Sequence, residues 1–253
     1  MLELRLKKIA YSKQLFIMLL LACSTLLLVV FKASAAHTGS ASDPLPIDSE
    51  DDLYKMAECM KYNKNWSNGK HFSLNCDIEL KTSIELSNSA EGYMFCGKFH
   101  GNGHTLTLSS GSPLFSTIGE GGYVENLVIK GAGYIAGENK GSIENCRSYV
   151  TAAYGIAGSN SGSIKKCNVN GIISSAGITN SNSGILSECY VEGIIRGCNA
   201  DLAGITHYNH QMGEIFKCDS SAAKFELISD KTVYRSRPYY TASVNYNEGK
   251  IIE

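Results

Sequence analysis

The amino-acid sequence predicts an all-β protein, a parallel β-helix of about five coils with a small N-terminal α/β cap. Three observations point to this fold class. A segment of 21–22 residues recurs from about residue 122 onward, its short apolar pairs lack helical periodicity, and the 253 residues include 25 Gly but only 4 Pro. A repeat of this length is typical of one coil of a β-solenoid, in which each coil stacks on the preceding one.

Residues 1–35 are predicted to be a signal peptide. They contain a basic start, an apolar run that ends at Phe31, and the small residues Ala33-Ser34-Ala35 as a cleavage site. This order of regions is typical of secretory signals. An uncleaved signal anchor is the alternative, because the apolar run is near the lower limit for spanning a bilayer. We therefore expect a secreted or cell-surface protein.

The charge balance argues against one class of function. The chain has 23 Lys and Arg against 24 Asp and Glu, and residues 1–35 carry five of these basic residues but only one acid. A sequence-independent nucleic-acid binder needs a basic surface that displaces counterions from phosphates. No nucleic-acid partner is expected, and a membrane is expected as a partner only through an uncleaved signal segment.

Residues 36–47 are predicted to be a linker, because small and polar residues surround two prolines. Residues 48–110 form the predicted cap. Acids at 48–52 precede apolar residues at helical spacing, which predicts a helix over 51–61. Alternating apolar residues predict a strand at 72–80.

Residues 111–253 hold the predicted coils, with an insertion at 219–243. Each copy of the repeat has an isoleucine, an asparagine and a cysteine at matching places. Because stacked coils align equal positions, we expect a core ladder of isoleucines, amides bonded along the stack, and thiols as buried apolar filler rather than disulfides. The glycine after each asparagine is expected to permit a turn conformation closed to other residues. The ladders are Ile135, Ile156, Ile178 and Ile205; Asn139, Asn160, Asn182 and Asn209; Cys146, Cys167, Cys189 and Cys218.

Metal binding and catalysis have little support in the sequence. His100 and His104 stand in a glycine turn rather than on one helix face, and cysteines in single file cannot surround an ion tetrahedrally. No acidic pair recurs between coils, as a glycosidase or lyase site would require. We expect no metal, no cofactor and no catalytic residue. A disulfide between Cys59 and Cys76 stays open as an alternative to free thiols.

The insertion at 219–243 is the predicted ligand-binding segment. Aromatic faces combined with arginine donors suit glycan rings or acidic groups of a partner protein. A loop that merely covers apolar coil is the alternative. The candidate binding residues are Tyr234, Arg235, Arg237, Tyr239 and Tyr240.

The repeats resemble those of a known family. The stretch FCGKFHGNGHTLTL at 95–108 and the repeats of form Asn-x-Gly-x-Ile-x-x-Cys look like the GLUG-motif repeats of bacterial surface and secreted proteins. The resemblance covers about residues 46–218. It implies a right-handed β-helix and a non-enzymatic module for adhesion or recognition, with a glycan or a host or cell-surface protein as partner.

Two other functions stay open at this point. Parallel β-helices also host polysaccharide lyases and hydrolases, so a carbohydrate-active enzyme is one alternative, and a structural spacer is another. The residues from Asn247 onward begin a coil that the chain does not complete. A partner chain, or sequence beyond the residues given, is therefore expected to cover the open strand edge there.

Overall fold

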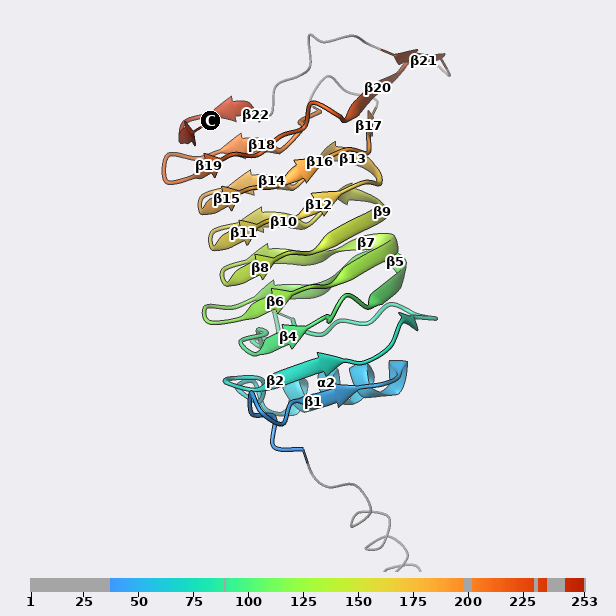
Figure 1. Ribbon diagram of the computed structural model, residues 1–253, viewed down its shortest axis with the longest axis vertical. Helices are drawn as coiled ribbons and strands as arrows, with labels where there is room; N and C mark the ends of the chain where they lie inside the picture. The colour runs from blue at the N-terminus through green and yellow to red at the C-terminus, as the bar shows by residue number, and fades with distance from the viewer. Residues whose placement is uncertain (1–36, 89, 198–201, 230–231, 236–243, 253) are drawn as a thin grey trace, which may run out of the picture. The chain divides into compact units, whose positions relative to one another are not determined.

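Parallel strands stack into a β-helix, which confirms the predicted fold class (Figure 1). The computed structural model describes residues 37–88, 90–197, 202–229, 232–235 and 244–252. Residues 39–253 belong to one compact unit. Among the described strands, every pair between neighbouring coils is parallel, and only β20 (Lys224–Ser229) and β21 (Thr232–Arg235) pair antiparallel.

One side of the stack is a nine-stranded sheet to which each coil contributes a short strand. In spatial order its members are β1 (Leu45–Ile47), β2 (His71–Leu74), β4 (Lys98–His100), β6 (Tyr123–Glu125), β8 (Ser142–Glu144), β11 (Ser163–Lys165), β15 (Ile185–Ser187), β19 (Glu214–Phe216) and β23 (Lys250–Ile252).

A fourteen-stranded sheet wraps around the remaining sides. Its main path runs through β21 (Thr232–Arg235), β20 (Lys224–Ser229), β17 (Ile194–Gly197), β13 (Ile172–Ala176), β9 (Arg147–Tyr154), β7 (Val128–Asn139), β10 (Ala157–Asn160), β14 (Thr179–Asn182), β18 (Thr206–Asn209) and β22 (Val244–Asn247). Off this path lie β3 (Ile78–Glu79), β5 (Thr105–Ile118), β12 (Asn168–Val169) and β16 (Tyr190–Val191).

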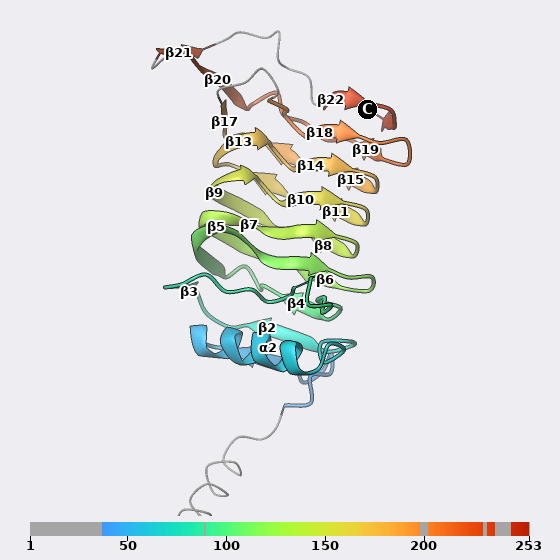
Figure 2. The same cartoon turned by 180° about the vertical axis from the view of Figure 1, so that it is seen from behind.

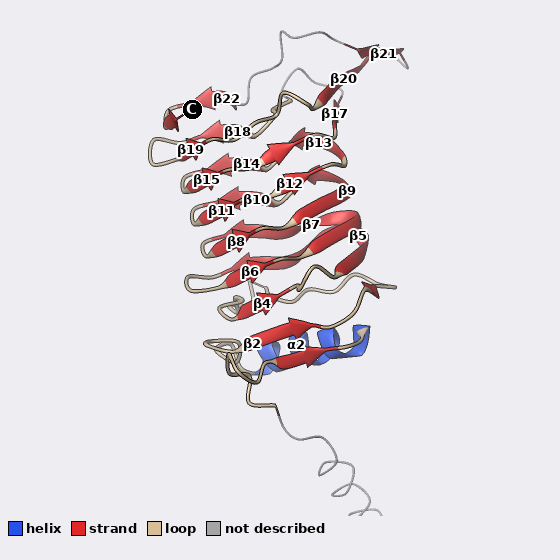
Figure 3. Cartoon of the chain, in the orientation of Figure 1, coloured by secondary structure: helices blue, strands red, loops and turns tan. Residues whose placement is uncertain are grey.

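The single helix in the described part of the chain is α2 (Glu50–Tyr62), which extends the predicted helix by one residue at each end (Figure 3). Acids fill its first turn, where they favour the positive end of the helix dipole. Its apolar face buries Leu53, Met56 and Met60. The helix lies beside β1 and β2 at the N-terminal end of the stack (Figures 1 and 2).

The predicted signal segment at 1–35 lies outside the described residues. In the part of the chain that is described, no helix is long and apolar enough to cross a membrane.

One stack of strands runs through the segments predicted to be linker, cap and coils. β1 lies in the predicted linker and pairs with β2, and its Pro46 is tolerated because β1 is an edge strand. The predicted boundary at 110/111 falls inside β5. The core is also continuous there, since Phe95 contacts both Phe72 and Phe115, with ring centroids 5.8 and 4.7 Å apart.

The stack is longer than the five coils predicted, as the nine strands of the first sheet show. Regular coil structure also continues into the first part of the predicted insertion at 219–243. β20 pairs in parallel with β17, so Lys224 to Ser229 continue the coil on which they follow. Arg196 on β17 holds this strand through Glu226, with 2.6 Å between Nη2 and Oε2.

The repeat asparagines form a hydrogen-bonded ladder inside the stack. Asn139 donates to Asn160, Asn160 to Asn182 and Asn182 to Asn209, each from Nδ2 to Oδ1 at 2.8 Å, and Asn209 continues to Asn247 at 2.7 Å. The ladder begins at Asn139 because Ile118 occupies the same place one coil earlier. The Oδ1 atom of Asn139 is consequently buried without a hydrogen-bond partner among the described residues.

The isoleucine ladder lies beside the amides. The N–H groups of Ile135, Ile156 and Ile178 each donate to the carbonyl of the next isoleucine along the stack, at 3.0, 3.0 and 2.9 Å. All of these side chains, including Ile205, are fully buried. The ladder therefore joins neighbouring coils through both the backbone and the core.

The glycines after the asparagines serve a different purpose from the one expected. Gly141, Gly162 and Gly184 are not among the glycines with positive φ. A Cβ atom at Gly162 would instead collide with the carbonyl oxygen of Gly141, and one at Gly184 with that of Gly162. The backbones of successive coils approach so closely at this turn that no side chain fits between them.

The stacked cysteines are free thiols in the core. Cys146, Cys167 and Cys189 are buried, Cys218 is half-buried, and each of the three buried thiols lies 3.3–3.4 Å from the carbonyl oxygen two residues earlier. Burial raises the pKa of the Cys167 thiol well above its usual range. The alternative Cys59–Cys76 disulfide is not formed, as both are free thiols.

Candidate functional site

In each repeat coil, the chain leaves the nine-stranded sheet at one residue whose backbone adopts the left-handed conformation, with positive φ. Asparagine adopts positive φ more readily than other residues with a side chain, and the three N-terminal positions of this set use it. Each residue stands directly before the leucine or cysteine of its coil, except Asn102, which precedes Gly103. The set is Asn102, Asn126, Asn145, Lys166, Glu188 and Lys217, with φ between 50° and 53°.

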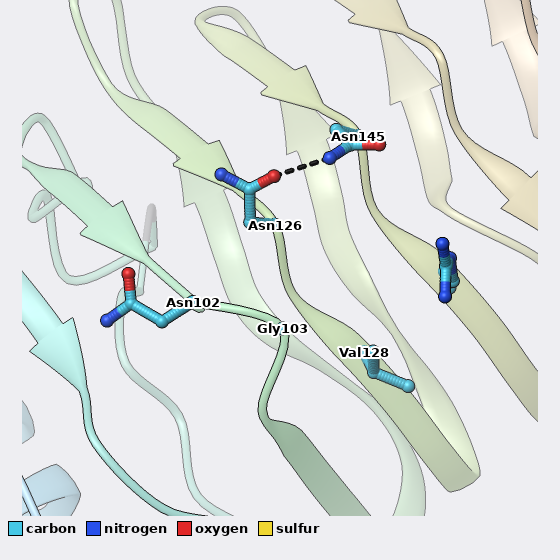
Figure 4. A pocket seen from close by; sticks show the side chains of 6 residues that line it. Asn102, Gly103, Asn126, Val128 and Asn145 are labelled. Atoms are coloured by element: carbon cyan, nitrogen blue, oxygen red, sulfur yellow. Dashed lines mark hydrogen bonds between the residues drawn. The ribbon is translucent and has the colours of Figure 1, made fainter.

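The three asparagines line a groove on the side of the stack, here called the lateral groove. It is lined by Asn102, Gly103, Asn126, Val128, Asn145 and Arg147 (Figure 4).

Part of the amide hydrogen-bonding capacity in the lateral groove is used within the protein. Asn145 donates from Nδ2 to Oδ1 of Asn126, as the dashed line in Figure 4 shows. Asn102 donates to the hydroxyl of Ser73 at 2.9 Å and to the carbonyl of Leu74 at 3.0 Å. Nδ2 of Asn126 and Oδ1 of Asn145 make no hydrogen bond to any residue that the structure describes. These two groups can donate to and accept from a ligand.

The strand register continues a row of side chains from the groove toward the C-terminal coils. Arg147 on β9 pairs with Asn168 on β12, which pairs in turn with Tyr190 on β16. Tyr190 is 46% exposed. Arg147 is exposed and has no ion-pair partner within the described ranges. A guanidinium, an amide and a phenol ring therefore follow one another at the spacing of one coil, about 4.8 Å.

Two carboxylates lie next to the groove, each directly before one of its asparagines. The hydroxyl of Tyr123 is within hydrogen-bond distance of both, at 3.1 Å from Glu125 Oε2 and 2.9 Å from Glu144 Oε2. Burial and these hydrogen bonds raise the pKa of Tyr123 above its usual range. Cations accompany the acids, because Lys166 Nζ lies 3.7 Å from Glu144 Oε1 and Lys98 Nζ lies 5.2 Å from the centre of the Tyr123 ring.

The aromatic segment predicted to bind a ligand is only partly described. Tyr234 and Arg235 lie on β21, where they pair with Leu227 and Glu226 of β20 at the margin of the fourteen-stranded sheet. Arg237, Tyr239 and Tyr240 lie outside the described residues. Whether these five residues form one site therefore stays a prediction.

The sequence did contain a signal for the lateral groove. Asn126 and Asn145 both stand one place before the buried residue of their coil, and Asn102 precedes a glycine. Recurring asparagine at one slot, outside the buried ladder, indicates a left-handed backbone position with an outward side chain.

The histidines of the glycine turn have separate partners. His100 Nδ1 lies 2.6 Å from Glu125 Oε1, and His104 Nδ1 lies 3.3 Å from Asp77 Oδ1. Within the described ranges, no group of three or more His, Cys, Asp or Glu is arranged to hold a metal ion.

Comparison with known proteins adds evidence on the fold. No protein-family model matches the chain, and no curated protein is significantly similar to it. The chain is similar to the crystal structure of "a putative immunoglobulin A1 protease from Bacteroides ovatus", with a TM-score of 0.55 and 16% identity over 85% of each chain. At this identity the likeness shows a shared fold and carries no activity across.

Proposed function

We propose that the protein is an exported, non-enzymatic recognition module that binds a glycan chain along the lateral groove. The observation that carries the proposal is the row formed by Arg147, Asn168 and Tyr190, which places one polar or aromatic side chain on each of three successive coils beside the asparagines of the lateral groove. A pyranose unit of an extended glycan has about the same length as one coil. Successive sugars can therefore meet equivalent groups.

The chemistry of the row suits sugars. Amide and guanidinium groups bind pairs of hydroxyls, and the apolar face of a pyranose packs against an aromatic ring. Glu125 and Glu144 add acceptors beside the groove. Export is supported by the predicted signal segment, and adhesion or recognition by the resemblance to GLUG-motif repeats.

The test is a panel of polysaccharides and glycoproteins incubated with the full chain, with binding and product release read from the same samples. Arg147→Ala and Tyr190→Ala are expected to weaken binding at least tenfold, since hydrogen bonds to charged groups contribute about 1.5–3 kcal/mol. Asn145→Gly removes an amide while keeping a residue that tolerates positive φ. This variant is also expected to weaken binding.

Two matched controls separate the groove from the rest of the surface. Lys217→Gly makes the same kind of change at the left-handed position three coils beyond Asn145, and Tyr62→Ala removes a tyrosine that is 85% exposed on α2. Both are expected to bind like the parent. Released oligosaccharide would favour the carbohydrate-active enzyme instead. Absence of binding to every member of the panel would favour the spacer.

A further inference from the structure

Two exposed cations lie side by side at the lateral groove. Arg147 lines the groove at the start of β9, and Lys130 lies on β7, one coil earlier. Val128 pairs with Arg147 and Lys130 pairs with Tyr149, so the two cations hold diagonal positions on neighbouring strands. Long side chains at diagonal positions reach the same point above a sheet.

The strand register places no acid directly beside these cations. Neither Arg147 nor Lys130 forms an ion pair within the described ranges. Their register partners on the adjacent coils are Thr107, Val128, Tyr149 and Asn168. The chain as a whole has no excess of basic residues, with 23 Lys and Arg against 24 Asp and Glu. The positive charge at the groove is therefore a local feature.

Two acids approach this part of the surface, and both have partners. Asp77, whose carboxyl group feels the charge of Lys130, accepts from the N–H of Thr105 at 2.8 Å. Glu144 Oε1 lies 3.7 Å from Nζ of Lys166. The guanidinium of Arg147 is thus left to bind an anion from outside the protein.

We propose that the glycan bound along the lateral groove is acidic, and that Arg147 and Lys130 bind the carboxylate of a uronic acid in it. This inference rests on the proposed function and names the class of glycan. The rigid fork of N–H donors on Arg147 matches the two oxygens of a carboxylate, and Lys130 adds a second positive charge. Nδ2 of Asn126 is a further donor in the same groove.

The row of side chains changes sign toward the C-terminal coils. Glu188 and Glu192 stand two residues before and two residues after Tyr190. Asp219 pairs with Tyr190 from the next coil, and a backbone N–H lowers the pKa of its carboxyl group, so it is ionised at pH 7. A carboxylate is therefore attracted at Arg147 and repelled two coils later. The acidic sugar binds at Arg147, and a neutral sugar packs on Tyr190.

The test compares two polymers that share one backbone and differ in charge. The full chain is titrated with polygalacturonate and with a highly methyl-esterified form of the same polymer, and binding is measured by calorimetry. We expect polygalacturonate to bind about tenfold more tightly or better at low salt. The difference should shrink as salt is added, because exposed charges are screened.

The variants locate the carboxylate. Arg147→Ala is expected to weaken polygalacturonate binding by about tenfold or more and Lys130→Ala by about threefold, and Lys130→Ala should leave binding of the ester unchanged. Arg147→Lys keeps the charge but loses the fork, so it should weaken binding several-fold. Glu192→Gln removes a repelling charge and should strengthen binding about twofold.

Lys140→Ala is the matched control, because it removes a cation at another turn, where Nζ lies 3.2 Å from Oε2 of Glu138. It should bind both polymers like the parent. Each variant is first compared with the parent by circular dichroism. Equal binding of the two polymers, both weakened by Arg147→Ala, would overturn the acidic ligand and leave glycan binding intact. Absence of binding to these polymers and to every neutral polysaccharide tested would overturn both proposals.

Discussion

At the scale of the residue, the buried amides show how one side chain connects two coils. Asn160 accepts from Asn139 and donates to Asn182, and it also lies within 3.3 Å of the carbonyl of Ile185. Its removal strands a donor and an acceptor in the core, where neither meets water. A buried polar group without a partner costs about 1–3 kcal/mol.

Asn160→Ala is therefore expected to lower the free energy of unfolding by about 2–4 kcal/mol. Chemical denaturation measures this change. Asn170→Ala is the control, because Asn170 is exposed on the surface of the same repeat copy, and it should change stability little. A similar effect of both substitutions would show that the ladder contributes nothing particular to stability.

A second residue-scale prediction concerns acid. The N–H of Thr105 donates to Asp77 Oδ1 at 2.8 Å, and this bond, with a smaller contribution from His104, lowers the pKa of Asp77. A carboxyl group whose pKa is lower in the folded state stabilises the fold above its unfolded value, and this contribution disappears as the pH falls through the folded value. Between about pH 5 and pH 2, the stability of Asp77→Asn should therefore depend less on pH than that of the parent. Urea unfolding across this range measures the slope, and identical slopes would contradict the assignment.

At the scale of the element, the tight turn after each ladder asparagine depends on glycine for space. Gly162 approaches Gly141 on one side and Gly184 on the other. Gly162→Ala forces neighbouring coils apart and is expected to cost about 2 kcal/mol or more. Thermal unfolding of Gly162→Ala and of the parent measures this loss of stability.

The control for that turn is Gly111→Ala. Gly111 has open space around its missing Cβ and is not among the residues with positive φ. This change is expected to be neutral or slightly stabilising, because alanine restricts the unfolded chain. Equal destabilisation by the two alanines would refute the close-approach argument.

Elements that repeat regularly are the ones that the sequence predicts. The ladder residues were readable because identical side chains recur at nearly constant spacing. The N-terminal coils were not, because β2, β4 and β6 are separated by longer and unequal segments, and Phe72 and Phe99 fill the place that Ile143 and Ile164 fill later. The strand β1 was hidden by its proline. The lateral groove was harder to predict, because its corner slot does not keep asparagine beyond Asn145: Lys166, Glu188 and Lys217 follow there.

At the scale of the whole molecule, sheet and core run without interruption from β1 to β23. The helix α2 packs on this same core through Leu53, Met56 and Met60. In a solenoid each coil is stabilised by its neighbours, so the N-terminal coils and the repeats are coupled.

We expect one thermal transition rather than separate ones for the N-terminal region and the repeats. Phe99→Ala and Ile164→Ala, both at fully buried positions, should each lower the temperature of that single transition, at a cost of about 2–5 kcal/mol. Scanning calorimetry with near-ultraviolet circular dichroism distinguishes one transition from two. A second transition affected only by Phe99→Ala would restore the cap as a separate domain.

The left-handed corner residues have a consequence for how the surface can change. Their backbone is set by the stacking of coils, so each corner projects its side chain from a nearly identical φ, whether it is asparagine, lysine or glutamate. The interior does not depend on that choice. The residues at these left-handed corners can therefore be exchanged without altering the core. A new pattern of exposed side chains can arise one coil at a time, on an unchanged backbone.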